Sequence, residues 1–135
     1  MGLISNPKAM DLANECREWM REQTVRGVRF CLPEITDYEV RRELLRGDKA
    51  RGIVRLDLLK SSICYLPITT SVMVKAAELW ADVRKRGLPT ADPKALDCDV
   101  ILAAQALSVD GVVATENVGH LARFVTALHW RDLTS

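Results

Sequence analysis

The sequence predicts an α/β protein whose helices alternate with the strands of a parallel sheet. Three short segments rich in β-forming residues, 28–32, 63–68 and 112–115, are separated by longer segments with helical periodicity. A further strand is predicted over residues 125–130. Strands that alternate with helices favour parallel pairing, because a crossover helix returns the chain to the same end of the sheet. The length fits one domain with a single core, residues 1–135.

Amphipathic helices are predicted before and between these strands. Asn6 can cap the first helix, and Pro7 suits its first position. Gly47 and Gly87 are suited to end the second and fourth helices. The expected helices span residues 7–23, 36–47, 48–60 and 70–87, followed by one that starts at Asp97 or Asp99 and ends before Gly111, and by a short helical turn over 118–124. In the third helix, the residues expected to face inward are Ile53, Val54 and Leu58. In the fourth helix, the apolar residues at helical spacing are Met73, Ala76, Ala77, Trp80 and Val83.

Composition and segment lengths place the chain among cytoplasmic globular proteins. Hydrophobic residues make up 48% of the chain and charged residues 27%, as in a soluble domain. Every apolar run is shorter than the roughly 20 residues needed to cross a bilayer. Polar residues such as Asp11 and Asn14 interrupt any signal-like stretch near the N-terminus, so we expect no membrane association.

The four cysteines are predicted to be small buried side chains. Cys16, Cys31, Cys64 and Cys98 are widely spaced and include no Cys-x-x-Cys pair. A zinc site needs paired ligands, and a disulfide scaffold is typical of chains too short to build a core. Both classes of site are therefore disfavoured.

Basic residues are unevenly distributed in a chain of formal net charge +1. This charge disfavours a polycation that coats nucleic acid, but two local clusters can still meet phosphates. The alternative is that both clusters are solvated helix faces. The first cluster comprises Arg41, Arg42, Arg46, Lys49, Arg51, Arg55 and Lys60, and the second Arg84, Lys85 and Arg86.

Acidic and amide side chains follow the predicted strands, at the sheet edge where parallel α/β proteins bind ligands. They are Glu39 after the first strand, Asn117 after the third, and Asp97 and Asp99 at the start of the apolar helix. Structural alternatives exist for each. Glu39 lies three residues after Thr36, which is the spacing of a capping box. Asp97 could cap its helix, and Asn117 could be a turn residue.

Taken together, these side chains predict a site for a hard divalent cation. Carboxylate and amide oxygens are the ligands that Mg²⁺ or Mn²⁺ prefers. Clustered carboxylates repel one another unless a cation neutralises them. A cation held there can activate water and stabilise charge on a scissile phosphate. The sequence offers no P-loop, Gly-x-Gly-x-x-Gly or Ser-His-Asp arrangement for a different chemistry.

Four motifs resemble those of the PIN-domain family, which includes the toxin nucleases of VapBC-type pairs. Residues 99–107, Asp-Val-Ile-Leu-Ala-Ala-Gln-Ala-Leu, look like the family's Asp followed by an apolar helix. Residues 111–117 are similar to its strand ending in Thr-x-Asn, and residues 35–39 to its acidic helix start. Residues 2–7 look like the segment that follows the family's first strand. The resemblance covers essentially the whole chain.

This resemblance implies a three-layer α/β/α sandwich around a central parallel sheet, and an acidic pocket that binds Mg²⁺ or Mn²⁺ and cleaves RNA. Glu39 and Asp99 would be metal-binding carboxylates, with Asp97 sharing the work of Asp99. Asn117 would act more weakly through a water, and Thr115 would orient that water or a phosphate. An antitoxin protein is the implied partner, and the chain is expected to form a homodimer.

The family's first strand, with its Asp, would precede residue 1 here. The expectation is either a longer natural protein or a shortened relative, and the alternative function is an inactive PIN-like module for binding or assembly. Arg41 or Arg42 would line an RNA groove, the other being solvated or paired with an acid. Arg84, Lys85 and Arg86 are further candidates for this role. The helix face that carries Met10, Cys16, Trp19 and Met20 could form part of a dimer interface.

Overall fold

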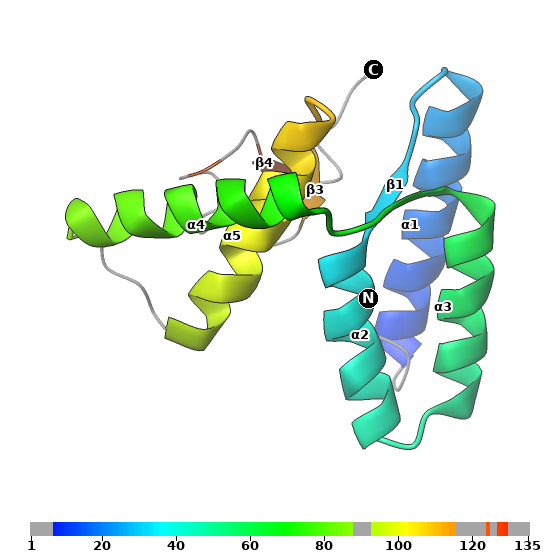
Figure 1. Cartoon of the computed structure of the whole chain (residues 1–135). Coiled ribbons are helices and arrows are strands. Elements are labelled where there is room, and N and C mark those ends of the chain that lie inside the picture. Colours follow the sequence, from blue (N-terminus) through cyan, green and yellow to red (C-terminus); the bar gives the residue numbers. More distant parts are fainter. Residues whose placement is uncertain (1–6, 88–92, 116–123, 125–126, 130–135) are drawn as a thin grey trace. The chain divides into compact units, whose positions relative to one another are not determined.

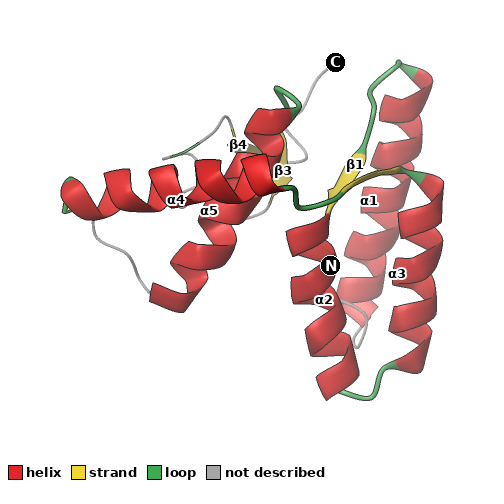
Figure 2. Cartoon of the chain, in the orientation of Figure 1, coloured by secondary structure: helices red, strands yellow, loops and turns green. Residues whose placement is uncertain are grey.

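The computed structural model describes residues 7–87, 93–115, 124 and 127–129. The chain forms two compact units, Met1–Leu66 with Ser135, and Pro67–Thr134. Helices dominate both, and the strands are short (Figure 2). Each unit contains one pair of parallel strands.

Within the described residues, the first unit contains three helices and two strands, and Figure 1 shows the arrangement of the helices. In chain order these are α1 (Pro7–Val25), β1 (Cys31–Pro33), α2 (Glu34–Arg46), α3 (Ala50–Ser62) and β2 (Cys64–Leu66). β1 and β2 pair in parallel, with Cys31 opposite Cys64 and Leu32 opposite Tyr65. The helical hairpin of α2 and α3 is the crossover that parallel pairing requires.

The core of the first unit lies where α2 and α3 meet the strands. Leu32, Leu44 and Leu56 are buried together. Gly52 of α3 lets the two helices approach closely, because a Cβ built there would lie 2.6 Å from Cδ2 of Leu44. A larger side chain at this position would force Leu44 out of its place.

The predicted inner face of α3 is wrong for two of its three residues. Val54 and Leu58 are 59% and 60% exposed, and Leu56 takes the core position instead. Gly52 and Leu56 are one helical turn apart and share the buried face, whereas Val54 and Leu58 lie on the opposite side of α3. Apolar residues occur on both faces of this helix, so periodicity alone could not identify the inner one.

In the part of the second unit that the structure describes, there are two long helices and a second strand pair. Its elements are α4 (Thr70–Lys85), α5 (Pro93–Ser108), β3 (Val113–Thr115) and β4 (Ala127–His129). Thr69 caps α4 by accepting a hydrogen bond from the Val72 N–H at 3.2 Å. β3 and β4 are parallel, with Val113 opposite Ala127 and Thr115 opposite His129.

The second core is apolar and rich in small residues. Its buried members are Val72, Ala76, Val83, Leu96, Val100 and Ala104. Ala103 is fully buried on α5 as well, and alanines at such positions allow two helices to approach closely. Met73 and Trp80, expected on the inner face, are 47% and 39% exposed. The buried stripe runs one residue earlier, through Val72 and Leu79.

The predicted α/β class with parallel pairing is confirmed. Within the residues that the structure describes, the four strands form two separate pairs. The strands are shorter than predicted, whereas four of the five helices begin within two residues of the expected start. Asn6 and most of the turn predicted over residues 118–124 lie outside the described residues. No helix in the described part of the chain is long and apolar enough to cross a membrane.

Candidate functional site

Glu39 lies inside α2 and does not cap it. The helix begins at Glu34, and its N-cap is Pro33, with φ −69° and ψ 142°. Thr36 is therefore helical, so the capping-box interpretation of Thr36 and Glu39 is wrong. Glu39 is half-buried in the second turn of the helix. Helix capping therefore does not account for the position of this carboxylate.

Asp97 and Asp99 also lie inside their helix and not at its start, where the sequence analysis expected one of them. Helix α5 begins at Pro93, so both aspartates lie in its second turn, and Asp97 is not the cap. Asp97 is exposed and Asp99 is half-buried. The buried side chains of Leu96 and Val100 flank them and fix this turn against the core. Glu39 belongs to the first unit, and both aspartates belong to the second.

The remaining predicted ligands lie near the end of β3. Thr115 is the last residue of this strand. Asn117 lies outside the described residues. Among the side chains that the structure describes, no group of three His, Cys, Asp or Glu residues is close enough to hold a metal ion.

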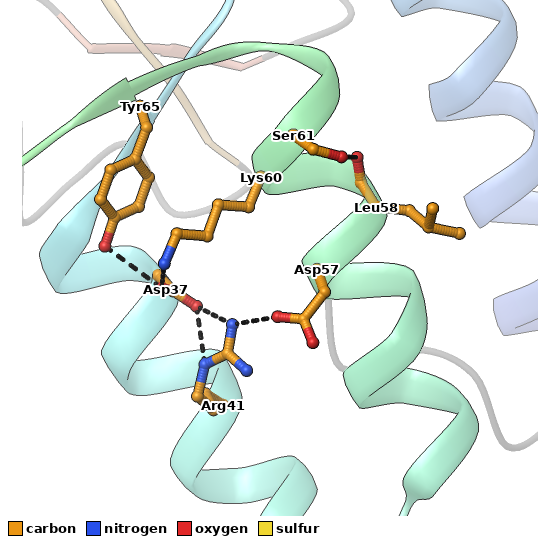
Figure 3. A network of polar contacts seen from close by, with 7 residues as sticks. All are labelled: Asp37, Arg41, Asp57, Leu58, Lys60, Ser61 and Tyr65. Atoms are coloured by element: carbon orange, nitrogen blue, oxygen red, sulfur yellow. Dashed lines mark hydrogen bonds and ion pairs between the residues drawn. The ribbon is translucent and has the colours of Figure 1, made fainter.

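A buried carboxylate that the sequence analysis did not select, Asp37, is the centre of a polar network (Figure 3). Its residue is only 6% exposed. The Arg41 guanidinium donates from Nε to Asp37 Oδ1 at 3.1 Å, and its Nη2 lies 2.9 Å from the same oxygen. Nη2 also donates to Asp57 Oδ1 at 2.8 Å. Because Asp57 belongs to α3, Arg41 connects the two helices.

The second oxygen of Asp37 is also engaged. The Tyr65 hydroxyl on β2 donates to Oδ2 at 3.2 Å, and Lys60 Nζ lies 3.7 Å from it. Lys60 Nζ also lies 4.5 Å from the centroid of the Tyr65 ring. Two carboxylates and two cations balance in this network, as a buried charge requires. These contacts connect α2, the helix that carries Glu39, to α3 and β2.

Two pKa shifts follow from this environment. Burial, followed by the negative charges of Glu34 and Asp37, raises the pKa of Tyr65 to about 12. Its hydroxyl therefore stays protonated and remains a donor at neutral pH. The hydrogen bond to Asp57 raises the pKa of Arg41, with Asp37 contributing in the same sense against the effect of burial.

The basic residues predicted to bind RNA differ in their surroundings. Arg41 is occupied by two carboxylates, whereas the Arg42 guanidinium lies 5.2 Å from the centroid of the exposed Tyr38 ring. On α4, Arg84 lies at the same distance from the Trp80 ring, and Lys85 is exposed. Arg86, which follows this helix, pairs with Asp82 at 3.2 Å. Arg41 is thus half-buried and held by carboxylates, whereas the other four basic residues are exposed.

Comparison with known proteins relates this chain to one family. The model of the PIN domain family matches residues 10–124. No curated protein sequence matches the chain.

Similar folds occur in three solved VapBC structures. VapBC-1 from nontypeable Haemophilus influenzae has a TM-score of 0.69 at 18% identity, covering 91% of this chain and 92% of the other. DNA-bound VapBC from Salmonella typhimurium gives 0.66 at 22% identity, covering 84% and 85%. VapBC2 from Rickettsia felis, bound to a DNA fragment from their promoter, gives 0.67 at 14% identity, covering 93% and 86%. Identities this low establish similarity of fold.

Proposed function

This chain belongs to the PIN domain family, and from that premise we propose that it is a metal-dependent endoribonuclease, the toxin of a toxin–antitoxin pair. One observation carries the proposal. Glu39 and Asp99 each lie half-buried in the second turn of a helix, where neither serves as a cap. Carboxylates at these positions supply the oxygen donors that a hard divalent cation prefers.

The proposed ligand set fits a hard cation. Glu39 and Asp99 supply carboxylates, with Asp97 beside Asp99 and Asn117 as a weaker ligand through a water. Oxygen donors without histidine or cysteine suit Mg²⁺ or Mn²⁺ better than zinc. The bound cation would activate water and neutralise charge on the phosphodiester. Thr115 is proposed to orient that water or a phosphate oxygen.

Asp37 is proposed as a positioning residue for this site. It lies two residues before Glu39 on α2, and its carboxylate ties that helix to α3 through Arg41 and to β2 through Tyr65. A rigid helix holds the Glu39 carboxylate in one place, which a metal ligand requires. Asp37 itself is surrounded by cations and a hydroxyl, so we assign it no contact with the metal.

RNA is proposed to be held by basic residues around these carboxylates. Arg42 is the better candidate of its pair, because Arg41 would have to leave Asp37 and Asp57 to meet a phosphate. Arg84, Lys85 and Arg86, at the end of α4, are proposed to contribute and are all exposed. Positive charge here would offset the repulsion between a carboxylate site and the RNA backbone.

An antitoxin is the proposed protein partner. The three similar structures are VapBC complexes, and two of them contain DNA. We extend this to a cytoplasmic toxin–antitoxin complex that contains a homodimer of this chain and binds promoter DNA. On the helix face suggested for dimerisation, Trp19 and Met20 are half-buried, and Trp19 meets Phe30 edge to face at 5.4 Å. The side chains of Met10 and Cys16 lie outside the described ones.

RNA cleavage tests the proposed activity. Wild-type protein should cleave RNA with Mg²⁺ or Mn²⁺ and lose cleavage on chelation. Glu39→Gln and Asp99→Asn should each reduce the rate by roughly a hundredfold or more, because a metal contributes several kcal/mol to such a transition state. Glu43→Gln is the matched control, since this glutamate lies on the same helix but pairs with Arg46 at the surface.

Unchanged activity in both site variants would refute the proposed ligands. A folded wild-type protein without metal-dependent cleavage would instead favour the alternative function, an inactive module for binding or assembly.

A further inference from the structure

Two cysteines far apart in the sequence face each other across the first strand pair. Cys31 on β1 and Cys64 on β2 are direct partners in the parallel register. Neighbouring strands lie roughly 4.8 Å apart, which falls within the roughly 4.4–6.8 Å separation of Cα atoms in disulfides. Side chains at partner positions project to the same side of a strand pair. The register therefore brings the two cysteines to the backbone separation at which disulfides occur.

The state of the two thiols supports a chemical pairing. Both are free and half-buried, in contrast to the fully buried side chains expected from the sequence. The Cys31 thiol is hydrogen-bonded to Cys64, and burial together with Cys64 raises the pKa of Cys31. Cys98 is a free thiol as well, but it belongs to α5 in the second unit.

A cation contacts one of the two sulfur atoms. Arg29, just before β1, donates from Nη2 to Cys64 Sγ at 3.4 Å. A neighbouring guanidinium is typical of reactive cysteines. On this contact we assign Cys64 as the attacking thiol of the pair and Cys31 as the resolving thiol.

We propose that Cys31 and Cys64 form a thiol–disulfide exchange site that is oxidised by low-molecular-weight disulfides. Cys64, as the thiolate, attacks one sulfur of the disulfide RSSR, and one RS⁻ leaves. Cys31 then gives its proton to solvent and attacks the Cys64 sulfur, which releases the second RS⁻. Protonation of the two leaving groups gives two RSH. The protein dithiol is oxidised to an intrachain disulfide, and RSSR is reduced.

Peptide mapping after treatment with oxidised glutathione tests the pairing. The native protein is incubated with the reagent, its remaining thiols are alkylated, and it is digested with trypsin. Every cysteine falls in a different tryptic peptide, with Cys31 in residues 30–41 and Cys64 in residues 61–75. The expected product links these two peptides. Complete alkylation of Cys31 and Cys64, or links distributed among all four cysteines as in denatured protein, would overturn the proposal.

Variants test the order of attack. Cys31→Ser should leave glutathione on Cys64 as a stable mixed disulfide. Cys64→Ser should slow the modification of Cys31 by about tenfold or more, because the activated thiol is missing. Arg29→Gln should slow the reaction of the pair several-fold, while Arg26→Gln, which changes an exposed arginine nearby, should leave it unchanged. Equal rates for both arginine variants, or undiminished modification in Cys64→Ser, would refute the assigned roles.

Discussion

In the first unit, α2 and α3 are joined by a buried carboxylate and its cations. In the second, α4 and α5 meet through alanines and aliphatic side chains. The charged arrangement depends on pairing, because a buried charge without a partner is costly. The apolar arrangement depends on shape, because a deleted methyl group leaves a cavity. Each pair of helices carries one candidate ligand. Glu39 lies on α2, in the pair joined by charges, and Asp99 lies on α5, in the apolar pair.

This difference predicts that the two candidate ligands, Glu39 and Asp99, respond to different perturbations. The orientation of Glu39 should depend on the ionic partners of Asp37. That of Asp99 should depend on the buried neighbours of α5, Leu96 and Val100. Variants of the Asp37 network and of the apolar core of the second unit therefore test the two kinds of helix packing separately.

The largest effect is expected in the apolar core. Leu96→Ala should lower the free energy of unfolding by about 2–5 kcal/mol, because Leu96 is only 2% exposed and its loss opens a cavity. Urea denaturation at two pH values should give the same loss, since its cause is not electrostatic. Leu107→Ala is the matched control on the same helix, and at 41% exposure it should change little. Equal losses for the two variants would contradict the assigned core.

A smaller loss is expected for the buried carboxylate. Asp37→Ala removes the acceptor of Arg41 and Tyr65, and should cost about 2–3 kcal/mol. Hydrogen exchange should become faster in α2 and α3, whose connection is weakened. Glu43→Ala removes an exposed ion pair from the same helix and should leave stability unchanged within error. An unaltered Asp37→Ala protein would show that the network does not hold these helices together.

The smallest effect concerns Tyr65 at high pH. Because the pKa of Tyr65 is raised to about 12 in the folded protein, the folded state retains this proton where the unfolded chain releases it. The contribution of the Tyr65 proton to the free energy of unfolding is therefore complete below about pH 10 and is lost as the pH rises through about 12. The loss should be about 1 kcal/mol, less than the full shift implies, because the side chain is only partly buried.

Alkaline denaturation of Tyr65→Phe measures this contribution. The variant should lose less stability between pH 10 and 12 than the wild type, whereas Tyr38→Phe, at a residue 55% exposed, should behave like the wild type. Identical pH dependence of all three proteins would exclude a buried donor role for the Tyr65 hydroxyl.

Much of the fold followed from local patterns in the sequence. Apolar periodicity located the helices, and β-forming runs that end near Pro33 and Leu66 located the first strands. The starts of α2 and α5 were misplaced because competing caps were available. Thr36 and Asp97 are good N-cap residues, but proline fixes the helix start earlier in both cases, at Pro33 as N-cap and at Pro93 in the first position.

The site was less accessible to sequence reasoning, since its geometry depends on contacts between distant residues. The spacing of Asp37 and Arg41 could have suggested an ion pair within one helix. Their partners Asp57, Lys60 and Tyr65 come from other elements, and only the fold brings them together. The same holds for Cys31 and Cys64, which become neighbours only through the strand register.

Glu39 and Asp99 are proposed to be ligands of a divalent cation. Calorimetric titration with Mn²⁺ is the decisive measurement, because it does not depend on a chosen RNA. We expect binding by the wild type and by Glu43→Gln, with the affinity lowered about tenfold or more in Glu39→Gln and likewise in Asp99→Asn. Wild-type affinity in either of these two site variants would contradict the claim.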